Sequence, residues 1–312
     1  MTILDAIIQG IVQGLTEFLP VSSSGHLNIT QHILPGSMES STFFNVMLHI
    51  GTLVAVIAFY HKLIWRLIKE FFCIIKDIFT GKFKWKEMSD DRRMVIMIII
   101  GLLPLFLLFL PVPGTGMKLK DFVETVIDSE KYFIVVGICL LLTSVLLLIG
   151  SLCSRGDVNM RHAKGGYVKA ARTALNVPDA IVIGIAQCFA VLPGLSRSGS
   201  TLAAGQMRGL EKQKALDYTF ILGTPAIIAA ALLEGKDAIE EGINVDILPV
   251  VIGMVVSAVV GYLAIWLFKW LLKTDKMIIF IVYTAIVGIA VIVISIIEMQ
   301  TGVNFFTHAP IA

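Results

Sequence analysis

The chain has 312 residues, of which 56% are hydrophobic and only 15% are charged, and its formal net charge is +2. A mean hydropathy of +0.86 lies far outside the range of soluble domains, so the composition excludes a soluble enzyme and indicates an integral membrane protein. Nothing in the charge indicates a nucleic-acid partner, and we expect none. The four cysteines are scattered without a CxxC pair, so neither a disulfide framework nor a zinc site is expected.

Six apolar stretches approach the roughly 20 residues that are needed to cross a hydrocarbon core. They cover residues 43–60, 94–111, 132–150, 215–233, 247–268 and 277–297. Two shorter apolar segments, 3–20 and 176–192, run directly into turns rich in Pro, Gly and Ser, which suits re-entrant helices better than spans. We therefore predict an all-α integral membrane protein, with a single membrane domain over residues 1–312, six transmembrane helices and two re-entrant helical segments.

Basic residues are unevenly distributed between the two sides that this arrangement creates. The segments 61–93, 152–214 and 269–276 hold 21 of the 25 Lys and Arg residues. The positive-inside rule places these segments in the cytoplasm and both termini outside. Segment 61–93, which we call the basic connector, mixes basic with aromatic residues. Two interpretations are equally good: an amphipathic helix and loop that lie against lipid headgroups, or a solvated connector.

The first apolar segment continues into GIVQGLTEFLPVSSSGHL, residues 10–27, which places polar and ionisable groups in hydrocarbon-like surroundings. Such groups usually face a bundle interior and mark a functional path. Gln13 and Glu17 are four residues apart and share a helix face. The helix should end at Leu19 or Pro20, because proline cannot continue it. The polar residues beyond the proline are Ser22, Ser23, Ser24 and His26.

Several chemical roles are open to this first motif. Glu17 is a candidate metal ligand, general base or partner of an arginine. Glu17 and Gln13 together offer oxygen ligands to Mg²⁺ or Ca²⁺, which often complete their shell with water and substrate phosphates. His26 lies three residues after Ser23, a spacing that lets a nucleophile and a base pair on a turn or at a helix start. The alternative is that His26 is a structural histidine.

A second motif, GIAQCFAVLPGLSRSGST over residues 184–201, aligns with the first at a shift of 174 residues without a gap. The identical pairs are Gly10–Gly184, Ile11–Ile185, Gln13–Gln187, Ser22–Ser196, Ser24–Ser198 and Gly25–Gly199. Duplication explains this alignment better than chance. The two repeats, about 1–151 and 174–298, would each contain one re-entrant segment and three spans, so the second repeat enters the membrane inverted and the site forms between them.

Arg197 is the only charged residue of the second motif, and a buried guanidinium requires an anion such as phosphate or carboxylate. Gly194 and Gly199 allow the backbone angles of an anion nest, which N–H groups at the start of the next helix would complete. Further hydroxyl donors are Ser196, Ser198, Ser200 and Thr201. The inverted repeat should bring Arg197 opposite Glu17 and His26. A purely structural ion pair between Arg197 and Glu17 is the alternative.

The remaining histidines carry weaker signals. Asn45 and His49 are four residues apart in the first span, where a supporting role at the site and simple packing are equally good explanations. The histidines without a motif, which we assign to the surface or to loops, are His32, His61, His162 and His308.

Through the stretches QGLTEFLPVSSSGHL and PGLSRSGST, in this order and on this hydropathy profile, the whole chain resembles the undecaprenyl pyrophosphate phosphatase family of bacterial inner membranes. The first stretch matches the family's (E/Q)xxxE signature, with the neutral option at Gln13, and the second matches its arginine motif. The resemblance implies hydrolysis of undecaprenyl diphosphate to undecaprenyl phosphate and inorganic phosphate, which recycles the lipid carrier of peptidoglycan synthesis. It also implies bacitracin resistance, because that antibiotic sequesters the lipid diphosphate.

The resemblance implies a catalytic set of Glu17, Ser23, His26 and Arg197. The residues placed beside it for substrate binding are Gln13, Ser22, Ser24, Gly194, Ser196, Ser198, Gly199 and Thr201. Glu17 and Gln13 would hold the divalent cation. Two mechanisms stay open. In the first, Ser23 or water attacks the phosphorus with His26 as base; in the second, His26 itself attacks.

The setting of the site follows from the same resemblance and from the predicted topology. The apolar tail of the lipid would lie in a groove between spans, and the site would open to the periplasmic face. A flippase for the lipid phosphate is the competing class, since inverted repeats with broken helices are a common transporter plan. The sequence is compatible with a homodimer.

Overall fold

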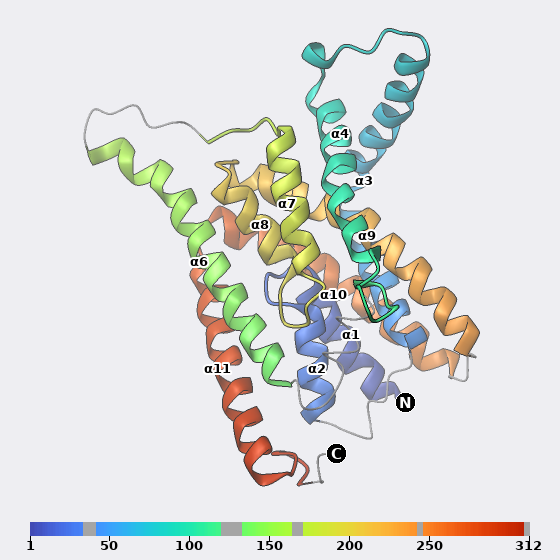
Figure 1. The fold of residues 1–312 in the computed structure, drawn as a ribbon, viewed down its shortest axis with the longest axis vertical. Coiled ribbons are helices and arrows are strands. Elements are labelled where there is room, and N and C mark those ends of the chain that lie inside the picture. Colours follow the sequence, from blue (N-terminus) through green and yellow to red (C-terminus); the bar gives the residue numbers. More distant parts are fainter. Residues whose placement is uncertain (34–41, 120–132, 164–170, 242–245, 309–312) are drawn as a thin grey trace.

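The computed structural model describes residues 1–33, 42–119, 133–163, 171–241 and 246–308, and within these ranges the chain is a bundle of helices without a strand (Figure 1). Six helices in these ranges are long and apolar enough to cross a membrane, as the sequence predicts. They are α3 (Thr42–Phe79), α4 (Asp90–Leu102) continued by η2 (Leu103–Phe109), α6 (Phe133–Ala163), α9 (Lys212–Glu241), α10 (Ile247–Lys273) and α11 (Ile278–Thr301). Residue 132, where the third span was expected to begin, lies outside the described residues.

Four shorter helices form two helix–turn–helix units. The first unit joins α1 (Ile3–Phe18) to α2 (Ser23–Ile33), and the second joins α7 (Val177–Phe189) to α8 (Arg197–Met207). At about 1.5 Å per residue, each of these helices is shorter than the roughly 30 Å of a hydrocarbon core. None of them is therefore long enough to cross a membrane alone. The predicted end of the first helix at Leu19 or Pro20 is confirmed, since Leu19 is the C-terminal cap of α1.

The first helix of each unit begins with the same local chemistry. Thr2 and Asp5 form a capping box at the start of α1, in which each side chain accepts a backbone N–H of the other. Asn176 and Asp179 form the equivalent box at the start of α7. The two boxes are 174 residues apart, which is the shift that aligns the two motifs.

The second helix of each unit also begins alike. The hydroxyl of Ser22 accepts the N–H of Gly25 at 3.3 Å, and the hydroxyl of Ser196 accepts the N–H of Gly199 at 3.1 Å. Serine stabilises a helix start in this way because the first N–H groups of a helix have no partner within it. The structure thus places equivalent serines at the starts of the two helices that carry Ser23 and Arg197.

The turns of the two units touch at the centre of the molecule. The hydroxyl of Ser198 donates to the carbonyl of Leu19 at 3.1 Å. Gly194 has a φ of 92°, and a Cβ atom there would lie 2.4 Å from the carbonyl oxygen of Val136 on α6, so only glycine fits. Thr143 of α6 holds the same turn, because its Oγ1 accepts the N–H of Ser196 at 3.0 Å.

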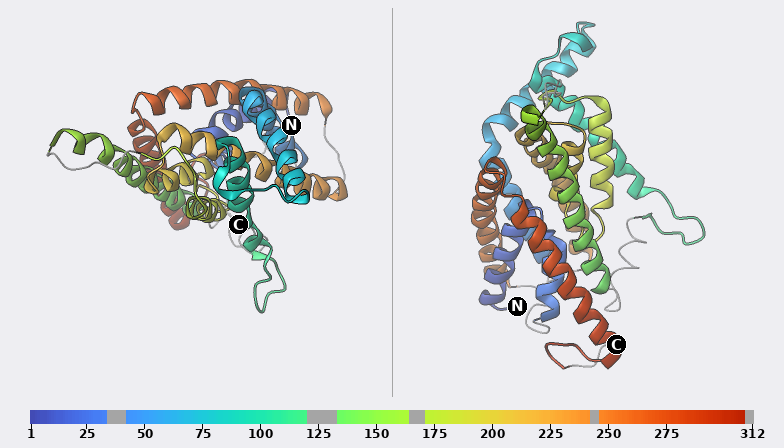
Figure 2. Two further views of the ribbon diagram at one scale, coloured as in Figure 1. Left: turned by 90° about the horizontal axis from the view of Figure 1, so that it is seen from above. Right: turned by 90° about the vertical axis from the view of Figure 1, so that its left-hand side faces the viewer.

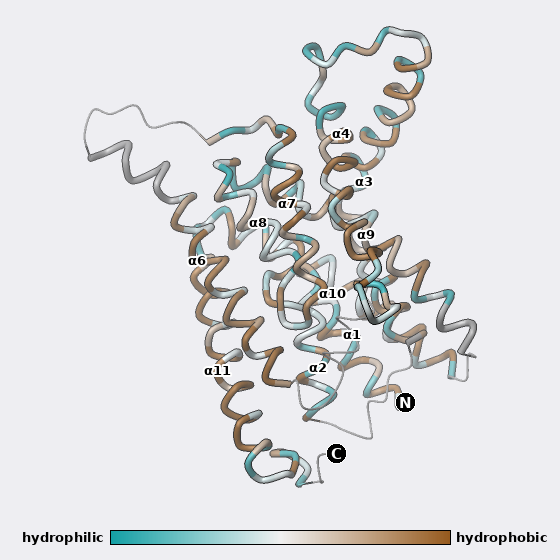
Figure 3. Tube along the Cα trace, in the orientation of Figure 1, coloured by the Kyte–Doolittle hydropathy of each residue, from teal (hydrophilic) through white to brown (hydrophobic). Residues whose placement is uncertain are grey.

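The basic connector is the continuation of α3 and the loop that follows it. α3 has a kink at Tyr60 and runs on to Phe79, and η1 (Trp85–Glu87) leads toward α4. At 38 residues α3 is about 57 Å long, which exceeds the 40–45 Å of a bilayer with its headgroups. The α3–α4 hairpin projects at the end of the molecule opposite the N-terminus and the end of α11 (Figures 1 and 2). α11 and residues 133–154 of α6 are mostly hydrophobic, whereas the tip of this hairpin mixes hydrophobic and hydrophilic residues (Figure 3).

Glycines allow α1 and α10 to pack backbone against backbone. A Cβ atom on Gly14 would lie 2.8 Å from the carbonyl oxygen of Ser257 and 2.9 Å from the Cβ of Val260. Small residues permit this close approach, which contributes van der Waals contacts between membrane helices. The contact matters for the site because α1 carries Glu17.

We expect Gly14→Ala to destabilise the protein by about 1–3 kcal/mol, the usual cost of overpacking a well-packed contact. The measurement is the thermal unfolding midpoint of the purified protein in detergent. Gly235→Ala in α9 is the matched control, because the nearest atom to its added Cβ is Val46 Cγ1 at 4.0 Å. Equal midpoints for Gly14→Ala and the control would contradict the packing argument.

Candidate active site

Glu17 is the centre of a cluster of hydrogen bonds at the end of α1. Its Oε2 atom accepts hydrogen bonds from the amide of Gln13 at 3.0 Å and from the hydroxyl of Ser23 at 2.8 Å. Its Oε1 atom accepts a hydrogen bond from Nη2 of Arg197, with which it forms an ion pair. The Nε2 atom of His49 lies 3.9 Å from Oε2. The predicted meeting of Glu17 and Arg197 across 180 residues of sequence is therefore present in the structure.

Arg197 is the first residue of α8, and its guanidinium is fixed on two sides. Besides the pair with Glu17, its Nη1 atom donates to the carbonyl of Gly223 on α9 at 3.2 Å. A Cβ atom at Gly223 would lie 3.1 Å from Nη1, so the glycine leaves room for the guanidinium. The N–H groups of Arg197 and Ser198 make no hydrogen bond within the described parts of the chain, so they are available to an anion at the start of α8.

A cavity of about 600 Å³ begins at this cluster. Its polar residues are Thr16, Glu17, Ser22, Ser23, Ser24, His49, Gln187, Ser196, Arg197 and Glu234. Apolar residues of η2, of the α7–α8 turn and of α9 make most of the remaining wall, and they include Leu105, Phe106, Phe109, Val191, Ile227 and Leu233. The cavity thus has a small charged and hydroxyl-rich part and a larger hydrophobic part.

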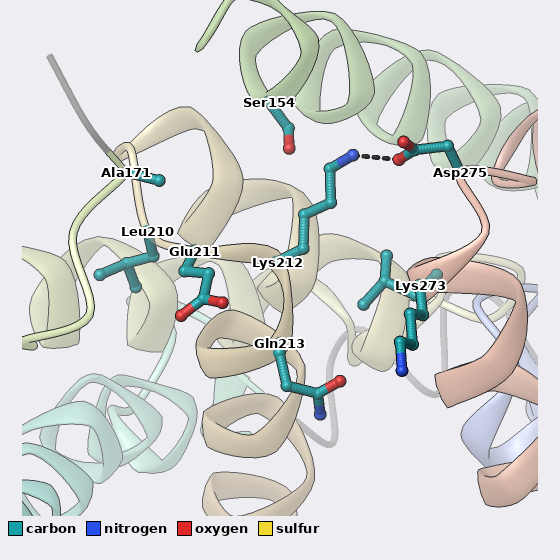
Figure 4. A pocket seen from close by; sticks show the side chains of 9 residues that line it. Ser154, Ala171, Leu210, Glu211, Lys212, Gln213, Lys273 and Asp275 are labelled. Carbon is teal, nitrogen blue, oxygen red and sulfur yellow. Dashed lines mark hydrogen bonds and ion pairs between the residues drawn. The ribbon is translucent and has the colours of Figure 1, made fainter. Parts of the chain in front are cut away.

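A second, smaller cavity of about 310 Å³ lies elsewhere, between the start of α9 and the end of α10. Lys212 and Asp275 form an ion pair at its rim, and Glu211, Gln213 and Lys273 lie nearby (Figure 4). None of the residues predicted from the two motifs lines this cavity. We therefore assign the chemistry to the larger cavity.

The predicted site residues divide into those that line the larger cavity and those that support it. Glu17, Arg197 and the serines Ser22, Ser23, Ser24 and Ser196 line it. The supporting residues are Gln13, Gly194, Ser198, Gly199 and Thr201, which do not line the cavity and instead make internal contacts. The hydroxyl of Thr201, for example, donates to the carbonyl of Arg197 at 2.8 Å.

The pairing of Ser23 with His26 that the spacing allowed is not formed in the structure. The hydroxyl of Ser23 donates to Glu17, while His26 contacts the carbonyl of Ser22 through Nδ1 and the hydroxyl of Tyr283 through Nε2, both at 2.8 Å. The imidazole also stacks on the Tyr283 ring of α11 at a centroid distance of 5.6 Å. His26 is therefore placed beside the site, at the contact between α2 and α11.

Another histidine, His49, lines the cavity. Its Nδ1 atom lies 2.8 Å from the carbonyl of Asn45, which turns Nε2 toward Glu17. The sequence signal for His49 was the i, i+4 spacing with Asn45, which did not distinguish a site from packing. His32, for which the sequence predicts a surface or loop position, instead lies in α2 with its side chain only 15% exposed and 2.7 Å from Glu298 on α11, so that prediction is wrong.

The oxygen atoms of Glu17 and Gln13 are of the chemical type that binds divalent cations. The Oε1 atom of Gln13 is buried without a partner among the described residues, next to the Glu17 carboxylate. Amide and carboxylate oxygens are ligands that Mg²⁺ and Ca²⁺ accept. No group of three or more His, Cys, Asp or Glu residues that could hold a metal occurs in the described ranges, so most of the shell would come from water and the bound anion.

The fold and the site together define a multi-pass membrane protein with a cluster of paired charges and hydroxyl groups buried among its helices. The sequence profile of the bacitracin resistance protein BacA family matches residues 6–290, and the chain belongs to this family. A protein of Methanosphaera stadtmanae named undecaprenyl-diphosphatase is 36% identical over 300 residues, covering 95% of this chain and 99% of the relative. Proteins with the same name from Alkaliphilus metalliredigens and Methanobrevibacter smithii are 35% and 38% identical, each over 95% of this chain, and the matches cover 100% and 99% of them.

Proposed function

We propose that this protein hydrolyses undecaprenyl diphosphate to undecaprenyl phosphate and inorganic phosphate. The observation that carries the proposal is the cluster of Glu17, Ser23 and Arg197 at the polar part of a cavity whose other walls are mostly apolar. The names of its relatives agree with this activity. The reaction regenerates the lipid carrier of peptidoglycan synthesis and counters bacitracin, which sequesters the lipid diphosphate.

Each part of the substrate has a complementary part of the cavity. Phosphoryl transfer is catalysed mainly by positioning and by electrostatic stabilisation of the phosphoryl oxygens. Arg197, the amides at the start of α8 and the hydroxyls of Ser22 and Ser196 would supply that stabilisation. The prenyl chain would lie along η2 and α9, where burial of apolar surface contributes affinity without specific contacts.

The hydrogen bond from Ser23 to Glu17 favours Ser23 as the nucleophile. The Oγ atom of Ser23 attacks the terminal phosphorus, its proton passes to Oε2 of Glu17, and the bridging P–O bond breaks to release undecaprenyl phosphate. Water then hydrolyses the phosphoserine, which releases inorganic phosphate and restores Ser23. A divalent cation held by Glu17 and Gln13 would neutralise charge on the diphosphate when bound.

We also propose that the two helix–turn–helix units are re-entrant segments of an inverted-topology repeat. The equivalent capping boxes and serine caps support this arrangement. So does the packing, since α1 of the first repeat contacts α10 of the second while α7 of the second contacts α4 of the first. In this topology both termini are outside the plasma membrane of a bacterial cell, the α3–α4 hairpin is cytoplasmic, and the substrate enters from the periplasmic side.

Purified protein in detergent with Mg²⁺ or Ca²⁺ should release phosphate from a polyprenyl diphosphate, and the KM should fall as the prenyl chain is lengthened because more apolar surface is buried. Addition of EDTA should lower the rate, and Mg²⁺ should restore it. Absence of release by a folded protein would contradict the enzyme assignment. Transfer of a labelled lipid phosphate between leaflets without any release would instead favour the flippase.

A further inference from the structure

Gln187 lies on the last turn of α7 and lines the cavity without taking part in the cluster around Glu17. Its side chain is almost completely buried, with the residue only 4% exposed. Neither Nε2 nor Oε1 of its amide has a hydrogen-bond partner among the described residues. A buried amide in this state is costly, and it is normally paired in a folded protein.

The first repeat unit explains why this amide has no partner. Gln13, the equivalent residue of α1, donates to Glu17 four residues later at 3.0 Å. The residue four positions after Gln187 is Val191, which has no acceptor in its side chain. Both Gln187 and Val191 line the cavity. The second unit therefore keeps the amide but lacks the carboxylate that would hold it.

The ligand that would pair with the amide follows from its neighbours. The same cavity is lined by Arg197 and Ser196, which are donors to an anion, and the rest of the wall near Gln187 is formed by apolar residues such as Ala190 and Val191. A neutral amide adds a donor to a phosphoryl oxygen without adding charge to the Glu17–Arg197 pair.

We propose that Gln187 is a substrate-binding residue whose Nε2 donates to a phosphoryl oxygen of the diphosphate, an inference that rests on the proposed hydrolysis. Hydrogen bonds to charged groups are stronger than those between neutral groups, so the loss of this one has a measurable effect.

Gln187→Leu should lower kcat/KM for a polyprenyl diphosphate by about 10-fold or more. The thermal midpoint should stay the same or rise, because two buried polar atoms without partners are removed. Gln187→Glu should lower kcat/KM further, because a carboxylate repels the diphosphate.

Gln206 of α8 is the matched control. It is 2% exposed, both of its amide atoms also have no partner in the described ranges, and it does not line the cavity. Gln206→Leu should affect the thermal midpoint as Gln187→Leu does and leave the kinetics unchanged. Wild-type kinetics in Gln187→Leu would overturn the inference. If Gln187→Leu does not fold, Gln187→Met provides the same comparison.

A second measurement separates this inference from the proposed function. Inorganic pyrophosphate should raise the thermal midpoint of the wild type, because a ligand that binds the folded state stabilises it. The rise should be smaller in Gln187→Leu than in Gln206→Leu. An inactive wild type that still shows this difference would refute the hydrolysis and retain the binding role, whereas equal rises in both variants would refute the role of Gln187.

Discussion

Arg197→Ala should lower the rate of phosphate release at least ~100-fold, the effect of removing a main electrostatic stabiliser of a transition state. The guanidinium is held by Glu17 and by the carbonyl of Gly223, and it has more N–H donors than these two bonds use. The remaining donors can bind phosphoryl oxygens at a position that is fixed before the substrate arrives. Steady-state kinetics of the purified variant with a polyprenyl diphosphate, together with a thermal unfolding curve, measure the effect.

Two further variants test whether the Glu17–Arg197 pair takes part in the reaction or is only a structural ion pair. Arg197→Lys keeps the charge but loses the planar fork, so most of the loss should remain. The double variant Glu17→Gln with Arg197→Gln removes both charges, so neither position holds an unpaired ion. If the ion pair is purely structural, this double variant should regain the wild-type rate. We expect the double variant to stay at least ~100-fold slower than the wild type, and we expect the same of Glu17→Ala alone.

The spans and the meeting of Glu17 with Arg197 could be predicted because each depends on a simple property of the sequence. The length and hydropathy of an apolar stretch decide whether its helix can cross a bilayer. The pairing of Glu17 with Arg197 followed from aligning the two motifs, since the turns of two equivalent units are expected to meet at their common centre. The capping boxes at Thr2 and Asn176 lie outside the two aligned motifs, and they are a further similarity between the two units.

The partners of individual side chains could not be predicted, because residues distant in sequence supply them. His26 is turned away from Ser23 by Tyr283, which is 257 positions later in the chain. The turn that precedes Arg197 is held by Thr143, which no motif includes. Ser198 and Thr201 were expected to bind substrate, but both hydroxyls donate to backbone carbonyls, which compete for Ser and Thr hydroxyls where water is scarce.

Ser23→Ala should lower the rate of phosphate release at least ~1,000-fold, because loss of a nucleophile removes the main route rather than one stabilising contact. The hydroxyl of Ser23 is 2.8 Å from Oε2 of Glu17, within the range for direct proton transfer, and both groups line the cavity. Glu17→Gln should cause a comparable loss, since a glutamine side chain cannot accept the proton. The effects of the two substitutions should not add, because the residues act as one unit.

His26→Ala provides the contrast that decides between the open mechanisms. In the structure the imidazole binds the carbonyl of Ser22 and the hydroxyl of Tyr283, so its loss should disturb the position of α2 and lower the rate less than Ser23→Ala does. Tyr283→Phe should then reproduce part of the effect of His26→Ala, because it removes the same contact.

Rapid acid quenching during turnover should trap phosphate on Ser23 as an acid-stable ester. An acid-labile phosphoenzyme that is absent from His26→Ala would instead identify His26 as the nucleophile, and a Ser23→Ala variant with near wild-type activity would exclude the serine mechanism.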